Sequence, residues 1–251
     1  MTAGEAATET ADLTQVNRTF HTLQQPMRLL PNYYAWTYGH FARWLHGTVI
    51  ELGCGAGWGL PFVVGHAERI IAVDHDDELL AGIRANLPGK VETRKADLMS
   101  ADWPELGTAR ADAIMMMDVL EHFADDRAFL ATACRFLKPG GALLIKVPAG
   151  AARYCAMDRA SGHYRRYDPQ DLEALAAALG LELVHLTSIN RLGGLAYRLR
   201  KRRETNFSRS FAPWQLRLIN TGLGVVRLAD YLPIADGLSL MAVLRKPADA
   251  P

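Results

Sequence analysis

The sequence predicts an α/β fold with a mostly parallel sheet, and three observations carry this prediction. Beyond Gly47, short apolar runs alternate with stretches of helical spacing, which is typical of strand–helix units. A glycine-rich turn directly follows the first apolar run. The chain has 251 residues, 49% of them apolar and 22% charged, which suits one α/β domain with a sizeable core.

Seven strands and four intervening helices are expected in order along the chain. The helix that begins at Pro169 has clear boundaries, because Asp168 is a good cap, proline suits the first turn, and Gly180 follows the last apolar position. The predicted strands are Thr48–Leu52, Arg69–Val73, Lys90–Arg94, Ala111–Met117, Ala142–Val147, Glu182–Ile189 and Leu238–Arg245. The predicted helices are Leu60–His66, Glu78–Asn86, Asp126–Leu137 and Pro169–Leu179.

Two segments flank or interrupt this pattern. Residues 1–13 have almost no large apolar side chains and are expected to form a disordered tail. Residues 14–46 are rich in aromatics and are interpreted as an N-terminal helical cap on the main domain, residues 47–251. The aromatics suit core packing, and Tyr33 or Tyr34 equally suits a lid over a ligand.

A helical insertion at 190–237 precedes the last strand. It opens with a basic run from Arg198 to Arg203, which is most often a solvated face. A helix with apolar residues at helical spacing follows, and we expect this stripe to pack on the domain. A substrate lid and a membrane-surface patch are the alternatives. The stripe consists of Trp214, Leu218, Ile219, Gly222, Val225, Val226 and Ala229.

Charge and cysteine content narrow the function classes. The net charge of +1 gives no strong electrostatic attraction to a polyanion, so nucleic acid is not a predicted partner. The three cysteines are widely spaced and form neither a disulfide framework nor a metal-ligand pattern. No signal peptide and no apolar stretch of membrane-spanning length is recognisable, and we predict a cytoplasmic protein.

The turn after the first strand reads Glu51-Leu-Gly-Cys-Gly-Ala-Gly-Trp-Gly59. Glycines let the backbone turn sharply and let a ligand approach the main chain. A dinucleotide fingerprint would need its third glycine where Trp58 stands, and a P-loop would need a lysine at the helix entry, which this turn lacks. The turn therefore argues against NAD and against nucleoside triphosphates.

Two acids indicate what the turn binds instead. Asp74 ends the second strand, 21 positions after Gly53, where a carboxylate can accept hydrogen bonds from both ribose hydroxyls. Asp97 follows the third strand, in position to accept from an adenine amino group. Together with the glycine turn, these acids predict an adenosine ligand.

These motifs, with Asp118-Val-Leu-Glu-His122 and Leu137-Lys-Pro-Gly-Gly141, resemble a class I S-adenosylmethionine-dependent methyltransferase. The resemblance implies a Rossmann-like seven-stranded sheet in the order 3-2-1-4-5-7-6, the last strand antiparallel, and S-adenosyl-L-methionine as cofactor, with S-adenosyl-L-homocysteine as product. It also implies a set of cofactor-binding residues. Those are Glu51, Gly53, Cys54, Gly55, Asp74, His75, Asp97, Leu98, Met117 and Asp118. Two residues outside that carry-over complete the predicted set: Tyr34 could hydrogen-bond the cofactor carboxylate or the acceptor, and His122 could lie near the cofactor.

A later segment, Asp158 to Tyr167, is similar to a recurrent feature of one bacterial branch of these enzymes. An acceptor hydroxyl or ammonium must lose a proton, and His163 is the first candidate for the base. Tyr164 and Arg166 are the other predicted catalytic residues. Arg165 and Arg166 could bind an acidic acceptor, or could pair with Asp158 and Asp168 to hold the loop.

The predicted function is methyl transfer to oxygen or nitrogen of a small-molecule acceptor, in specialised metabolism. The alternatives are C-methylation, a membrane-peripheral enzyme acting on a lipid-linked acceptor, and a non-catalytic cofactor-binding partner subunit; a homodimer is left open. The fourth strand lacks the Asn/Asp-Pro-Pro-aromatic motif of nucleobase N-methylation. Catechol-type enzymes would show an Asp-Asn pair after the fifth strand, where this chain has Pro148-Ala-Gly-Ala151, so we predict no metal.

Overall fold

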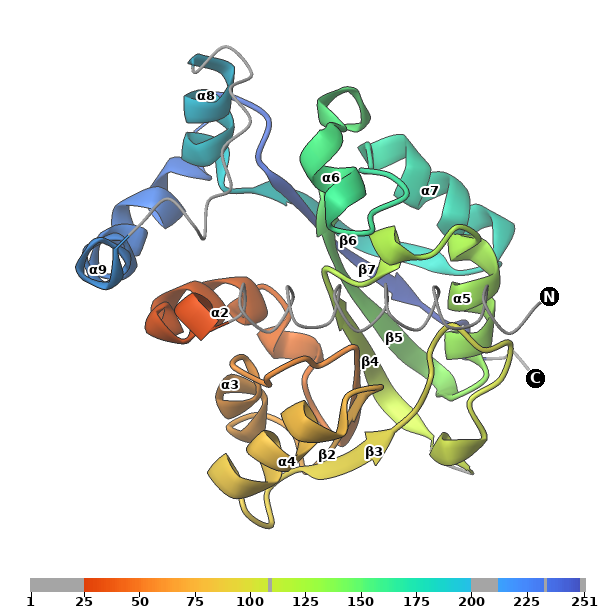
Figure 1. Ribbon diagram of the computed structural model, residues 1–251. Coiled ribbons are helices and arrows are strands. Elements are labelled where there is room, and N and C mark those ends of the chain that lie inside the picture. The colour runs from red at the N-terminus through yellow and green to blue at the C-terminus, as the bar shows by residue number, and fades with distance from the viewer. Residues whose placement is uncertain (1–24, 108–109, 200–211, 233, 249–251) are drawn as a thin grey trace, which may run out of the picture.

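The computed structural model describes residues 25–107, 110–199, 212–232 and 234–248 and contains a seven-stranded sheet in the order β3-β2-β1-β4-β5-β7-β6 (Figure 1). β1 to β5 run parallel, and β7 runs antiparallel to both β5 and β6. The predicted fold class and strand order are thereby confirmed. The strands are β1 Thr48–Leu52, β2 Arg69–Asp74, β3 Glu92–Lys95, β4 Ala111–Met117, β5 Leu137–Pro148, β6 Glu182–Ile189 and β7 Ser239–Arg245.

The largest error in the predicted elements lies at the start of β5. The predicted helix Asp126–Leu137 ends at Cys134, and the strand expected from Ala142 begins at Leu137. Leu137 pairs with Ala111 across a register shift in β4, so the Lys138-Pro139-Gly140-Gly141 segment already belongs to the sheet. Pairing with β4 therefore overrides the helix-like spacing of the preceding residues.

Helices cover both faces of the sheet. One core contains the side chains from α5 and α7 with Ile50 and Leu52, and the other contains those from α2, α3, α4 and α9 with Val49. Figure 1 shows these two helical layers on either side of the strands. The helices are α2 Pro31–Gly39, α3 Leu60–Val64, α4 Asp77–Asn86, α5 Asp126–Cys134, α6 Ala156–Ala160, α7 Pro169–Ala178, α8 Arg191–Leu199 and α9 Pro213–Ala229. Short 3-10 turns are η1 Gln25–Leu29, η2 Ala42–Trp44, η3 Pro104–Leu106, η4 Leu120–His122 and η5 Ala151–Arg153.

The N-terminal cap and the insertion meet on the same face of the sheet. Asn32 at the start of α2 donates from its backbone N to Asn220 Oδ1 at 2.8 Å, and its side chain donates to the Asn220 carbonyl at 3.0 Å. α8 and α9 form the insertion, and β7 follows them. The predicted tail and Arg200 to Arg203 of the basic run lie outside the described residues, and Arg198 is exposed.

The predicted packing face of α9 is wrong in part. Trp214, Leu218 and Val225 are 65–67% exposed, whereas Leu216 and Leu223 are buried. α9 has apolar residues around most of its circumference, so spacing alone does not select the stripe that meets α2. Within the described residues, every helix is too short or too polar to cross a bilayer.

Candidate active site

The glycine turn joins β1 to α3 at the carboxyl edge of the sheet. Gly53, Gly55 and Gly57 have φ values of 65°, 53° and 69°, a region that side chains other than glycine rarely adopt. A Cβ on Gly53 would lie 2.8 Å from Val119 Cγ2, in the loop after β4. The turn therefore needs glycine both for its backbone and for the approach of the neighbouring loop.

Glu51 lies just before the turn and is 2% exposed. Tyr38 of α2 donates a hydrogen bond from its hydroxyl to Glu51 Oε1 at 2.5 Å, and Glu51 Oε2 is buried without a hydrogen-bond partner. Burial raises the pKa of Glu51 to about 7, although the hydrogen bond from Tyr38 acts in the opposite direction. Cys54, two residues into the turn, is a buried free cysteine. The Glu51 carboxylate thus has one oxygen prepared for a cationic ligand.

Asp74 at the end of β2 connects to the turn. Its carboxylate accepts from the Gly55 backbone N at 2.8 Å and from the Asp76 backbone N at 3.1 Å, and His75 Nδ1 lies 3.2 Å from Oδ1. The hydrogen bond to Asp74 raises the pKa of His75. A carboxylate has about four lone-pair sites, so Asp74 can still accept from a sugar. Asp97 follows β3 and is exposed, with Leu98 half-buried beside it.

The loop after β4 places charged groups beside the aromatic cap. Asp118 follows Met117 with a φ of 57° and pairs with Lys146 of β5, whose side chain is only 4% exposed. The Lys146 ammonium lies 5.9 Å from the centre of the Tyr33 ring, and the charges of Lys146 and Asp118 both act on Tyr34. Burial is the main cause that raises the pKa of Tyr34. Tyr34 therefore lies in the electric field of both charges of the Lys146–Asp118 pair.

Both arginines of the Asp158–Tyr167 segment are engaged in ion pairs. Arg166 donates from Nε to both oxygens of Asp158 at 2.9 Å. Arg165 pairs with Asp126 of α5 at 2.9 Å, so the predicted pairing with Asp168 is wrong. Asp168 instead accepts from the Ala151 backbone N at 3.2 Å. Both guanidinium groups are therefore already paired with carboxylates of the protein and are not available to bind an acidic acceptor. Tyr164, the third predicted catalytic residue, is 55% exposed.

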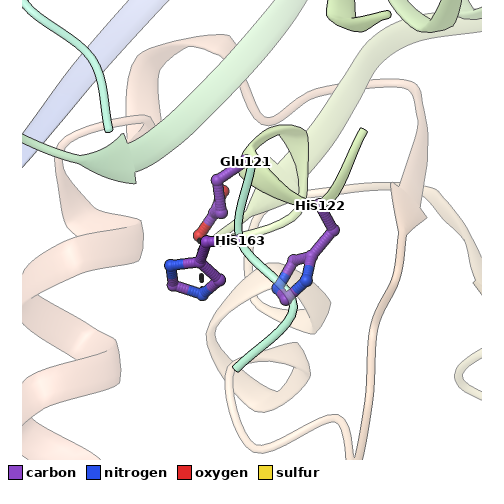
Figure 2. Close-up of side chains that lie close together, drawn as sticks. All are labelled: Glu121, His122 and His163. Carbon is purple, nitrogen blue, oxygen red and sulfur yellow. Dashed lines mark ion pairs between the residues drawn. The ribbon is translucent and has the colours of Figure 1, made fainter. Parts of the chain in front are cut away.

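His163 lies against the loop after β4. Its Nδ1 is 3.3 Å from Asp158 Oδ1, and its Nε2 is 4.0 Å from Glu121 Oε1. The ring of His122 meets the ring of His163 edge-on at 4.7 Å between centres (Figure 2). Burial lowers the pKa of His163, and it lowers that of His122 to about 4. The structure therefore brings together one predicted catalytic residue and one predicted cofactor residue.

Glu121 is the residue that sequence reasoning missed. Its side chain is fully buried, and neither carboxylate oxygen has a hydrogen-bond partner. Burial, followed by the charge of Asp118, raises the pKa of Glu121 well above its usual range. The only available signal was its place between Asp118 and His122 in a motif that the resemblance already used.

Comparison with known proteins shows which family the chain belongs to. The family model described as "Methyltransferase domain" matches residues 13–186. The chain belongs to this methyltransferase domain family. A "probable S-adenosylmethionine-dependent methyltransferase" of Mycolicibacterium smegmatis is 28% identical over 215 residues, which cover 79% of this chain and 81% of that protein.

Two further methyltransferases are similar to the chain. The ubiquinone biosynthesis O-methyltransferase of Rhizobium etli strain CIAT 652 is 27% identical over 156 residues, which cover 56% of this chain and 62% of that enzyme. The 1,6-didemethyltoxoflavin-N1-methyltransferase of Burkholderia thailandensis, solved with its substrate and S-adenosylhomocysteine, superposes with a TM-score of 0.59. It is 17% identical and covers 98% of this chain and 91% of its own, so it supports the fold alone.

This methyltransferase is therefore an enzyme of class I that uses S-adenosyl-L-methionine, and the alternative of a non-catalytic partner subunit is set aside. The residues present fit that cofactor. Glu51 Oε2 is an orphaned buried oxygen that suits the ammonium of the methionine part, and the turn that follows has no Cβ at Gly53 or Gly55.

Proposed function

We propose that this enzyme methylates an oxygen or nitrogen of a small-molecule acceptor. The supporting observation is the polar cluster of Glu121, His122 and His163 at the carboxyl end of β4, on the same sheet edge as the glycine turn. An acceptor hydroxyl or ammonium must lose a proton before or during methylation, and this cluster is the place for that event. The name of the Rhizobium etli enzyme denotes an oxygen acceptor, which agrees with the proposal.

S-adenosyl-L-methionine would supply an electrophilic methyl group on a sulfonium, with a neutral leaving group. Glu51 would hold its ammonium, Gly53 and Gly55 would admit its methionine part, and Asp74 would hold its ribose. Tyr34, Cys54, His75, Asp97, Leu98, Met117, Asp118 and His122 complete the proposed cofactor set. Orientation of this kind supplies roughly 7–11 kcal/mol of barrier lowering in well-positioned systems.

The N-terminal cap and the insertion would enclose the acceptor. The two asparagine hydrogen bonds between α2 and α9 hold these segments together. Tyr33 and Tyr34 are half-buried on the side of α2 that faces Lys146 and Asp118. An aromatic wall next to a few polar groups is the usual composition of a small-ligand pocket. Contact with anionic lipid through the basic run, and a cytoplasmic location, stay predictions.

The proposal is tested by acceptor-dependent formation of S-adenosyl-L-homocysteine. Purified enzyme is incubated with S-adenosyl-L-methionine and panels of phenols, carboxylic acids, amines and nitrogen heterocycles, and methylated products are identified by mass spectrometry. At least one hydroxyl or nitrogen acceptor is expected to raise product formation well above the rate without acceptor. Methylation found only at carbon would refute the proposal. His163→Ala should lower turnover on a working acceptor while leaving cofactor affinity nearly unchanged.

A further inference from the structure

Glu121, His122 and His163 form a donor set that the proton-handling role does not fully explain. Each residue offers one ligand atom, and these atoms all lie within 4.8 Å of one another (Figure 2). One carboxylate with two imidazoles is a common donor set for zinc and for other divalent transition metals. The prediction of no metal rested on the cysteine spacing and on the segment after β5, and this donor set lies elsewhere.

The buried carboxylate of Glu121 is the second, independent observation. A fully buried carboxylate normally has hydrogen-bond or ionic partners, because desolvation without them is costly. Glu121 is 0% exposed and both of its oxygens lack hydrogen bonds. The His163 Nε2 atom lies 4.0 Å from Glu121 Oε1, which is too long for a hydrogen bond. An ion between these two atoms would provide the missing partner.

The ring of His163 is already oriented as in metal sites. Metal-binding histidines usually donate their other ring N–H to a carboxylate or a carbonyl. His163 Nδ1 faces Asp158, which leaves Nε2 pointing toward Glu121. The backbone of Gly162 hydrogen-bonds to His122. Arg166 brings a positive charge nearby, but both of its short contacts go to Asp158.

We propose that Glu121, His122 and His163 bind one divalent transition-metal ion, of the zinc, cobalt or manganese class, beside the acceptor. Ligand atoms about 2.1 Å from a tetrahedral zinc lie about 3.4 Å apart, so modest side-chain rotation closes the site. This inference rests on the proposed function for its purpose, because a bound cation lowers the pKa of an oxygen ligand such as an acceptor hydroxyl. The proton leaves to water, the oxygen bonds to the methyl carbon, and the electron pair of the broken carbon–sulfur bond stays on sulfur.

The experiment is a titration of chelator-treated full-length protein with Co²⁺, followed by visible absorption and by metal content after gel filtration. One Co²⁺ per chain is expected, with a spectrum typical of nitrogen and oxygen ligands, and Zn²⁺ should displace it. Glu121→Gln and His163→Asn should each weaken Co²⁺ binding about 100-fold or more, and Asp158→Asn, which acts through His163, by about 10–100-fold. His66→Ala is the matched control, because His66 is exposed and lies before β2 at the opposite edge of the sheet.

Binding of S-adenosyl-L-homocysteine, measured by calorimetry on the same samples, distinguishes failure of the metal site from failure of the proposed function. Variants that keep this binding but lose Co²⁺ support the metal site. Wild-type protein that binds the nucleoside but no Co²⁺, Zn²⁺ or Mn²⁺ overturns the metal site and leaves the proposed function intact. Variants that bind Co²⁺ as tightly as wild type overturn the assignment of ligands. Wild-type protein without nucleoside binding contradicts the proposed function itself.

Discussion

Glu51 couples folding stability to pH in a way that a single substitution can expose. Its pKa is about 7 in the folded protein against an ordinary value of 4.5. Between these values the folded chain retains a proton that the unfolded chain has lost, so the free energy of unfolding falls as pH rises. The difference in pKa corresponds to about 3 kcal/mol from this one group.

Glu51→Gln should remove that pH dependence, since glutamine has the same shape and no titrating proton. Urea unfolding of both proteins at pH 5 and pH 8 gives the measurement. From pH 5 to pH 8, wild type should lose about 2.5 kcal/mol relative to the variant, since part of the difference already falls below pH 5. Parallel pH profiles for the two proteins would refute the buried, neutral state of Glu51 at low pH.

The same group should make cofactor affinity depend on pH. If Glu51 holds the ammonium of the methionine part, only the ionised carboxylate is competent for binding. The competent fraction rises by about tenfold from pH 6 to pH 8 for a pKa of about 7. The affinity for S-adenosyl-L-homocysteine should therefore rise by about tenfold in wild type and much less in Glu51→Gln. Equal slopes in both proteins would place the ammonium elsewhere.

Three further predictions concern stability. Gly53→Ala should cost about 1–3 kcal/mol because of its positive φ and crowded Cβ position, whereas Gly82→Ala, with open space in α4, should stabilise by about 0.5–1 kcal/mol; chemical denaturation compares them. Leu223→Ala should cost about 2–5 kcal/mol and the exposed Leu218→Ala about 0.5 kcal/mol or less, and equal losses would contradict the observed orientation of α9. Asp126→Ala should cost about 1–3 kcal/mol, because it leaves the buried Tyr167 hydroxyl and the half-exposed Arg165 guanidinium without their acceptor, and a thermal melt that matches wild type would contradict this.

The strands could be located from the sequence because they are short apolar runs separated by glycine, proline and helix caps, whereas their order followed from the resemblance to class I methyltransferases. Thr48–Leu52, Ala111–Met117 and Glu182–Ile189 have the predicted bounds. Where the pattern was ambiguous, tertiary contacts decided. Leu137 has the spacing of the preceding helix but pairs with β4, and α9 offers apolar residues on more than one face.

The motifs that form the site could be predicted from the sequence, but the pairs that their side chains form could not. The glycine turn and Asp74 could be located because both directly follow strands of a parallel sheet, whose carboxyl ends share one edge. The partners of Arg165 and His163 could not be predicted, because Asp126 and Glu121 lie about 40 positions earlier in the sequence. Separation along the sequence does not predict which carboxylate pairs with a basic side chain in a loop.

Three buried carboxylates at this sheet edge differ in how many of their hydrogen-bonding positions are filled by the protein. Asp74 is buried but accepts two backbone N–H bonds, so its charge is stabilised without a ligand. Glu51 has one donor and one orphaned oxygen, and Glu121 has no hydrogen-bond partner from another residue on either oxygen. Unmet hydrogen-bonding capacity therefore increases from Asp74 through Glu51 to Glu121, and buried groups of this kind persist where a ligand completes them. The ammonium of the cofactor suits Glu51. The charges of Lys146 and Arg166 act on Glu121 but are paired with Asp118 and Asp158, and an ion shared with His122 and His163 is the partner proposed for its carboxylate.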